Sequence, residues 1–139
     1  MTLSIRNQLP GTVTEVRPGE VMATVGVRLD GGQNVTAAIT LEAVEQLALA
    51  PDLPVRVLVK STEVSLATDR VRGLSIRNQL PGAVTHLVIG DVMASVKVTV
   101  DGGELTAAIT RDAAEDLGLF VGSDVVALIK ATEVSLATV

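Results

Sequence analysis

Hydrophobic and polar positions alternate with a period of two along much of the chain. Between positions 21 and 29, valine, alanine and leucine occupy every second position, and other residues fill the positions between them. This alternation is typical of a β-strand with one buried face. Asp30 and the glycines after it predict a turn, because glycine tolerates positive φ. Residues 35–40 then predict the returning strand.

Residues 41–49 break this period, since leucine and valine recur there on one side of a predicted helix. Thr40 is a suitable N-cap for that helix, glutamates occupy its early turns, and the prolines at 51 and 54 end it. Alternating apolar positions predict a further strand at 55–59 and another at 64–66, and residues 3–8 and 13–16 predict two more. Five or six short strands and one short helix fit a small OB-like β-barrel.

The whole pattern occurs twice in the chain. SIRNQLPG is found at residues 4–11 and again, unchanged, at residues 75–82, and 38 of the 64 aligned positions of the two copies are identical. A repeat of this kind redefines the folding unit. We therefore predict an all-β protein with one short helix per repeat, built as two tandem OB-like β-barrel domains: residues 1–68, a short linker at 69–74, and residues 75–139.

Composition narrows the possible functions. The chain is 47% hydrophobic, carries a net charge of −5 and has no cysteine, so disulfides and thiolate chemistry are excluded. Phe120 is the only aromatic residue, and a single-stranded nucleic acid needs stacking rings and a basic groove. No apolar run is long enough to span a membrane, and the N-terminus lacks a signal-peptide core, so we expect a cytoplasmic location. A repeat of about 65 residues is only marginally stable alone, which predicts an oligomer.

An enzyme is not expected. His86 is the only histidine, and its counterpart in the other repeat is Glu15, so a symmetric imidazole site is excluded. The acidic residues around Asp30 and Asp101 do not have the spacing of a calcium loop. We therefore predict neither a bare metal cation nor a cofactor.

Three short segments are candidates for binding an anion. If residues 4–8 form a strand, Ser4 and Arg6 project from one face, although a polar edge strand would show the same pattern. Lys60 and Ser61, matched by Lys130 and Ala131, stand at a chain break with free backbone N–H groups. Because the second repeat has alanine after the lysine, that position would act through its backbone N–H. A lysine at a strand end can also simply extend its ammonium to water.

The third candidate is the threonine before each helix. Thr40 and Thr110 stand where a helix N-terminus presents unpaired N–H groups, which favours an oxyanion. Capping the helix is the alternative role for both residues.

Three motifs together resemble the mop domains of molbindins: SIRNQLPG, the GGxxxTAAIT hairpin and helix start, and the closing K-[SA]-T-E-V-S-L-A-T. Two units in one chain resemble the di-mop form. The resemblance implies OB-like barrels that bind molybdate or tungstate between units, strands exchanged between units, and six units in a homotrimer. It places the S-x-R segment of one unit beside the K-[SA] segment of another, with the helix-start threonine nearby. The implied oxyanion-binding residues are Ser4, Arg6, Thr40, Lys60, Ser61, Ser75, Arg77, Thr110, Lys130 and Ala131.

The function expected from this resemblance is storage and homeostasis of molybdate or tungstate, with the oxyanion as ligand. The alternative is a molybdate-responsive sensor that presents a regulatory surface to another protein. A nucleic-acid-binding barrel rests on fold analogy alone, and the acidic net charge opposes it. Neither a nucleic acid nor a membrane is an expected partner.

Overall fold

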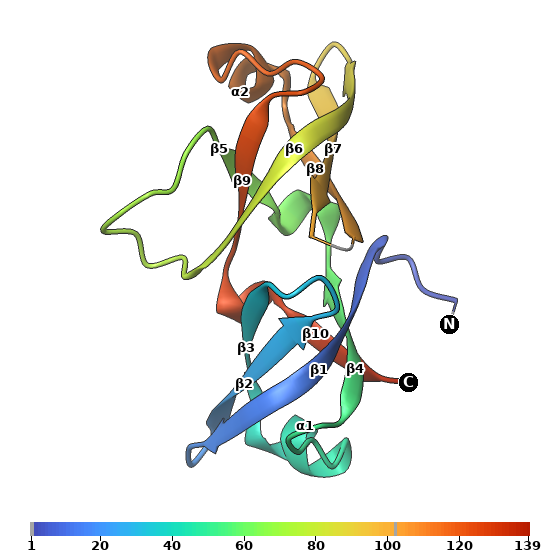
Figure 1. The fold of residues 1–139 in the computed structure, drawn as a ribbon, viewed down its shortest axis with the longest axis vertical. Coiled ribbons are helices and arrows are strands. Elements are labelled where there is room, and N and C mark those ends of the chain that lie inside the picture. The colour runs from blue at the N-terminus through green and yellow to red at the C-terminus, as the bar shows by residue number, and fades with distance from the viewer. Residues whose placement is uncertain (1, 102) are drawn as a thin grey trace.

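Two curled five-stranded sheets lie one above the other along the long axis of the molecule (Figure 1). The computed structural model describes residues 2–101 and 103–139. The first half contains β1 (Asn7–Pro18), β2 (Met22–Leu29), β3 (Asn34–Thr40), α1 (Leu41–Gln46), β4 (Pro54–Val59), the 3-10 turn η1 (Ser61–Glu63) and β5 (Ser65–Ala67). The second half contains β6 (Asn78–Ile89), β7 (Met93–Val100), β8 (Gly103–Thr110), α2 (Arg111–Asp116), β9 (Asp124–Ile129), the 3-10 turn η2 (Ala131–Glu133) and β10 (Ser135–Thr138).

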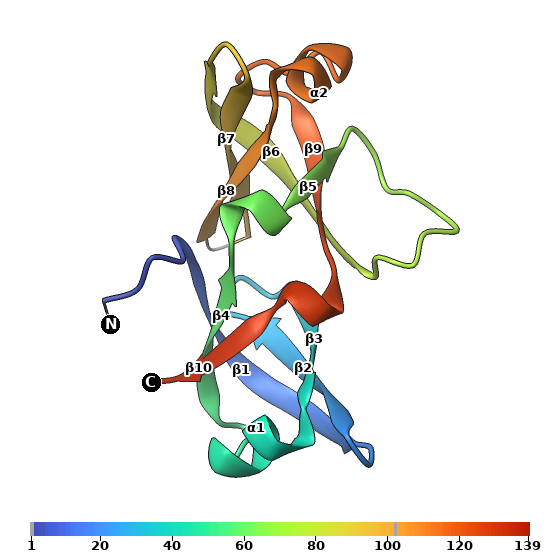
Figure 2. The same cartoon turned by 180° about the vertical axis from the view of Figure 1, so that it is seen from behind.

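The two repeats exchange their last strands. The first sheet has the order β10-β4-β1-β2-β3, and the second has the order β5-β9-β6-β7-β8. Strand β10 therefore crosses into the first sheet, where Leu136 pairs with Val57, and β5 crosses into the second, where Leu66 pairs with Ala127. Figures 1 and 2 show both crossings from opposite sides. The exchange predicted from the family resemblance is confirmed within one chain, as are two nearly all-β, OB-like units.

Strand β1 is one continuous strand of 12 residues, so the predicted division into two strands, at residues 3–8 and 13–16, is wrong. The backbone N and carbonyl of one residue point to the same side of an extended strand. The carbonyl of Pro10 accepts from the N–H of Asp30, on the β2 side. The ladder with β2 begins only at Gly11, so the missing N–H of Pro10 removes no ladder bond.

Gly11 is required by close packing instead of by a turn. A Cβ atom at this position would stand 2.7 Å from Val27 Cγ1 and 2.8 Å from the Arg28 carbonyl oxygen. The strand also has neighbours on both sides, β4 and β2. Of the segment at residues 4–8, only Asn7 and Gln8 belong to the strand, and they pair with β4 alone.

The core is built from small aliphatic side chains on the inner faces of both sheets. Val25, Val96 and Leu105 are completely buried, and the buried side chains of both repeats form one cluster. Helices α1 and α2 lie at the two far ends of the molecule (Figure 1). The predicted helix at 41–49 ends earlier, at Gln46, because Ala48 adopts a left-handed conformation with φ 52°.

Two polar side chains are buried among the described residues, Asn7 and Asn78. Each occupies the same place in its repeat, at the first position of the long strand. Asn7 hydrogen bonds with the backbone of Thr106, and Asn78 hydrogen bonds with the backbone of Thr36. The amides therefore join each repeat to the edge strand of the other.

Candidate functional site

A short segment outside the sheet precedes each long strand and carries the S-x-R residues. We call residues 4–6, before β1, the first hook and residues 75–77, before β6, the second hook. Strand β1 begins at Asn7, so Ser4 and Arg6 lie before it, and the predicted strand over residues 4–8 is wrong for this part. The amide of Gln8 donates from Nε2 to the Ile5 carbonyl over 3.0 Å, which turns the hook back toward the strand. Gln79 makes the same bond to Ile76 in the second repeat, over 3.2 Å.

The first hook lines a hollow of about 330 Å³ together with the end of β4 and the start of η1. Its lining residues are Ser4, Ile5, Arg6, Lys60, Ser61 and Thr62. The antiparallel register pairs Asn7 with Val59, so the next positions outward bring Arg6 beside Lys60. The expectation that Ser4 and Arg6 meet a lysine only from another unit is therefore wrong, since strand pairing joins the two segments within one repeat.

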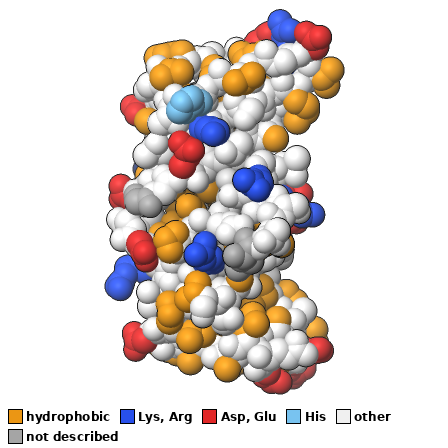
Figure 3. Space-filling model, turned by 90° about the vertical axis from the view of Figure 1, so that its right-hand side faces the viewer, with side chains coloured by type: hydrophobic (Ala, Val, Ile, Leu, Met, Phe, Trp, Pro, Cys, Tyr) orange, Lys and Arg blue, Asp and Glu red, His pale blue; other side chains and the backbone are white. Residues whose placement is uncertain are grey.

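The hollow gathers hydrogen-bond donors of several kinds. Within η1, Glu63 donates its N–H to the Lys60 carbonyl over 2.9 Å, so the turn does not use the N–H groups of Ser61 and Thr62. Arg6 and Lys60 are exposed, and among the described residues neither forms an ion pair within 4.0 Å. Two cations, hydroxyl groups and free backbone N–H groups suit an oxyanion. In Figure 3, most of the Lys and Arg side chains on the face shown lie over the middle of the molecule.

The second repeat has the same backbone arrangement around Arg77 and Lys130, but other residues surround it. Register again brings Arg77 beside Lys130, because Asn78 pairs with Ile129. The turn η2 has the same N-terminal bond, from the Glu133 N–H to the Lys130 carbonyl over 3.0 Å. Ala131 supplies the same backbone N–H as Ser61 without a hydroxyl. Arg77 also lines a separate hollow formed with the linker.

Within one chain, the structure does not bring Thr40 to the first hollow. The hydroxyl of Thr40 accepts from the Ala43 N–H over 3.1 Å and caps α1, at the opposite end of the sheet. It lines a hollow of about 420 Å³ with Val21, Leu41 and three glutamates, whose charge opposes an anion: Glu20, Glu42 and Glu45.

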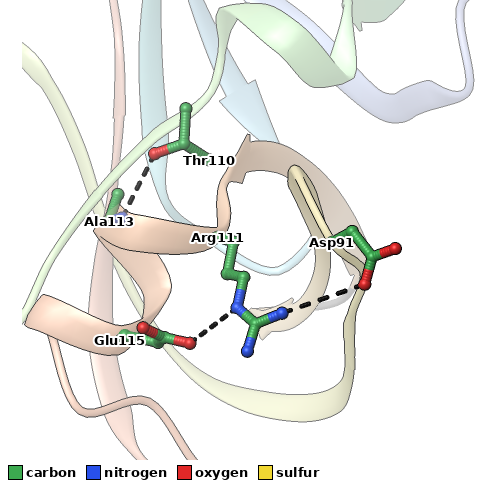
Figure 4. Close-up of polar contacts among 5 residues, drawn as sticks. All are labelled: Asp91, Thr110, Arg111, Ala113 and Glu115. Carbon is green, nitrogen blue, oxygen red and sulfur yellow. Dashed lines mark hydrogen bonds and ion pairs between the residues drawn. The ribbon is translucent and has the colours of Figure 1, made fainter.

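Thr110 occupies the equivalent place at the start of α2. Its hydroxyl caps the Ala113 N–H over 3.1 Å, and Arg111 beside it pairs with Glu115 at 2.8 Å and with Asp91 at 4.0 Å (Figure 4). Arg111 is therefore already paired with two carboxylates. Within one chain, capping is therefore the role that the geometry gives to both threonines.

Other parts of the described chain suit an anion or a metal less well. Another hollow, of about 630 Å³, has three aspartates and one arginine as its charged lining residues: Asp69, Asp101, Asp124 and Arg70. No group of three His, Cys, Asp or Glu side chains converges to hold a metal ion within residues 2–101 and 103–139. No helix of the described part is both long and apolar enough to cross a membrane.

Sequence reasoning missed several residues of this region. Thr62 lines the hollow, Gln8 and Gln79 hold the hooks, and Asn7 and Asn78 join the repeats. Their identity in both copies of the repeat was the available signal. It does not distinguish a residue that touches a ligand from one that positions another residue.

The chain is similar to proteins of molybdenum metabolism along its full length. The solved structure of the cytoplasmic molybdate-binding protein ModG, with molybdate bound, has a TM-score of 0.96 and 39% identity, covering 100% of both chains. The molybdenum-pterin-binding protein MopB of Rhodobacter capsulatus is 40% identical over 136 residues, which are 96% of this chain and 50% of MopB. The transcriptional regulator ModE of Yersinia pestis is 36% identical over 137 residues, which are 97% of this chain and 52% of ModE.

The chain spans about half the length of the curated relatives it matches, and all of ModG. A TOBE domain is recognised in residues 3–66 and again in residues 74–136. These findings confirm the resemblance indicated by the repeated motifs. The chain therefore belongs to the TOBE-domain family and carries two TOBE domains in tandem.

Proposed function

We propose that this protein binds molybdate or tungstate and acts as a cytoplasmic store that keeps the oxyanion available. The observation that carries the proposal is the hollow in which Ser4, Arg6, Lys60 and Ser61 converge. The full-length match to ModG, named as a cytoplasmic molybdate-binding protein, supports the choice of ligand and compartment.

A tetrahedral dianion needs several donors directed at four oxygens. Hydrogen bonds between charged partners are about twice as strong as neutral ones, so Arg6 and Lys60 contribute most and the N–H groups of η1 fix the orientation. The net charge of the chain is −5, which repels a dianion at long range. Attraction must therefore come from these local cations, and the size of the closed pocket would separate molybdate from sulfate.

We further propose that three chains assemble into a homotrimer of six TOBE domains. Exposed apolar side chains at matching places of the two repeats support an assembly, since Val21 and Val92 are each 73% exposed and Met22 and Met93 each 45%. In that trimer, Thr40 and Thr110 would complete pockets on neighbouring chains. The second repeat would use Ser75, Arg77, Lys130 and Ala131 for the same ligand.

A regulatory role is the second candidate. The similarity to a ModE protein named as a transcriptional regulator favours it. In this case the bound oxyanion would change a surface that another protein recognises. A partner captured only in the presence of molybdate would favour sensing, and unchanged capture with and without molybdate would favour storage.

Isothermal titration with molybdate tests the proposed ligand. Lys60, Lys97 and Lys130 are the three lysines of the chain, and Lys97 lies exposed on β7 and lines neither the first hollow nor the hollow beside the linker. The Lys60→Ala/Lys130→Ala variant should bind at least about tenfold more weakly, whereas Lys97→Ala should bind as the unchanged protein does. Absence of binding by the folded, unchanged protein would refute the proposal. Native mass spectrometry of the same samples reports the number of chains and of bound oxyanions.

A further inference from the structure

The linker between the repeats surrounds the second hook with arginines that the first hook does not have. Residues 70–90 contain Arg70, Arg72 and Arg77 and no Asp or Glu. The three arginines line one hollow of about 530 Å³ together with Asp69, Val71, Gly73 and Gln79. The two described residues before the first hook, Thr2 and Leu3, are uncharged.

Gln79 fixes the shape of this linker. Its Oε1 accepts from the Val71 N–H over 3.0 Å, and its Nε2 donates to the Val71 carbonyl over 2.9 Å. The same Nε2 also donates to Ile76 in the hook. One side chain therefore ties the backbone of the linker to the segment that carries Arg77, and the three arginines line one hollow.

The charges in this space favour an anion. Arg70, Arg72 and Arg77 form no ion pair within 4.0 Å in the described part of the chain. Asp69 is the one carboxylate of the hollow, and it accepts a backbone hydrogen bond from Arg70 over 2.7 Å. Asp101 lines the adjoining hollow of about 460 Å³, which also contains Arg70 and Arg77. Two carboxylates, Asp69 and Asp101, therefore lie in the two hollows that the three arginines line.

We infer that the linker hollow is a second type of oxyanion site, which takes tetrahedral dianions on Arg70, Arg72 and Arg77. The inference rests on the proposed function for its physiological ligand. Because the arginines are exposed and the hollow is open, the site recognises charge and not size, and sulfate binds there as molybdate does. It collects dianions beside the second hook in a chain whose net charge repels them.

The test follows the Nε–Hε resonances of the arginines by NMR during titration with sodium molybdate or sodium sulfate at constant ionic strength. We expect the resonances of Arg70 and Arg72 to shift with both anions at similar concentrations, and Arg77, which the proposed function also assigns to the molybdate pocket of the second repeat, is compared between variants in the sulfate titration. In Arg70→Gln/Arg72→Gln, half-saturation of the Arg77 shift should need an anion concentration about fivefold higher. The matched control, Arg28→Gln/Arg56→Gln, removes two exposed arginines elsewhere and should leave that concentration unchanged.

Two outcomes overturn the inference: an unchanged Arg77 titration in Arg70→Gln/Arg72→Gln, or an equal weakening in the control variant. The resonance of Arg6 keeps the two proposals separate. If Arg6 responds to molybdate while the linker arginines do not, the linker site fails and the proposed function stands. If the linker arginines respond while Arg6 does not, the first hollow fails as a molybdate site and the linker site stands.

Discussion

The side chain of Asn7 pairs with the backbone of Thr106, 99 positions further along the chain. Its Nδ2 donates to the Thr106 carbonyl over 2.9 Å, and its Oδ1 accepts from the Thr106 N–H over 2.8 Å. Asn78 makes the equivalent pair with Thr36 at 2.8 and 2.9 Å. A primary amide offers the same donor and acceptor as a backbone strand. Each asparagine therefore satisfies the backbone N–H and carbonyl of one residue on an edge strand, β8 or β3, of the other repeat.

Replacing either asparagine by alanine should destabilise the whole protein. Asn7→Ala leaves the N–H and carbonyl of Thr106 without their partner in a partly buried place, which costs about 1–3 kcal/mol. Asn78→Ala should cost a similar amount through Thr36. Urea unfolding followed by circular dichroism measures both losses.

The matched control for these variants is Asn34→Ala, because Asn34 is an exposed asparagine. Its free energy of unfolding should change by less than about 0.5 kcal/mol. Equal losses for Asn7→Ala and Asn34→Ala would show that the two inter-repeat bonds do not stabilise the fold.

Much of the fold could be predicted from local patterns. The alternation of residues 21–29 predicted β2, and Thr40 predicted the start of α1, because these signals depend on neighbours in the sequence. The strand through Pro10 and Gly11 could not be predicted in this way. Proline and glycine are typical of turns, and only the neighbouring strand shows that the N–H of Pro10 is not needed and that Gly11 must lack a Cβ.

The sequence predicted which residues form the candidate site, but it did not predict how they are arranged. Ser4, Arg6, Lys60 and Ser61 line one hollow, but the position of Arg6 beside Lys60 depends on the pairing of β1 with β4. No local pattern in the sequence indicated that Asn7 would hydrogen bond with the backbone of Thr106. An asparagine near a strand end is ordinarily exposed, and its burial depends on an edge strand 99 positions away.

The end of each helix offers a stability test with an internal control. Ala48 adopts φ 52°, and the aligned residue of the second repeat is Gly118, with φ 61°. Residues other than glycine rarely adopt this backbone conformation, because their Cβ atom approaches the backbone too closely. Ala48→Gly should therefore raise the free energy of unfolding by about 1 kcal/mol, and Gly118→Ala should lower it by a similar amount. Thermal unfolding measures both changes, and shifts of the same sign in the two variants would contradict the explanation.

The linker should become sensitive to trypsin when Gln79 is shortened. Gln79→Ala removes both bonds to Val71, which lies between two cleavage sites, Arg70 and Arg72. Losing two hydrogen bonds should raise the rate of cleavage in the linker about tenfold. Mass spectrometry of timed digests identifies the cut positions.

Gln8→Ala is the control for the linker, because Gln8 bonds only to its hook among the described residues. Cleavage after Arg70 and Arg72 should stay at its original rate in this variant. An equal increase in both variants would indicate general loosening of the protein, and not release of the linker.

The residue after the site lysine should act through its backbone N–H. Ser61→Ala should change molybdate affinity by less than about threefold, since the second repeat already has Ala131 there and the turn is the same. Ser61→Pro removes the N–H at the first position of a 3-10 turn, where proline is tolerated. Lys60, with φ −65° and ψ 141°, already has the extended backbone that a residue before proline prefers. The variant should therefore fold normally and bind at least about tenfold more weakly by isothermal titration. If the folded Ser61→Pro protein keeps its affinity while Ser61→Ala loses it, the hydroxyl is the donor and the N–H is not.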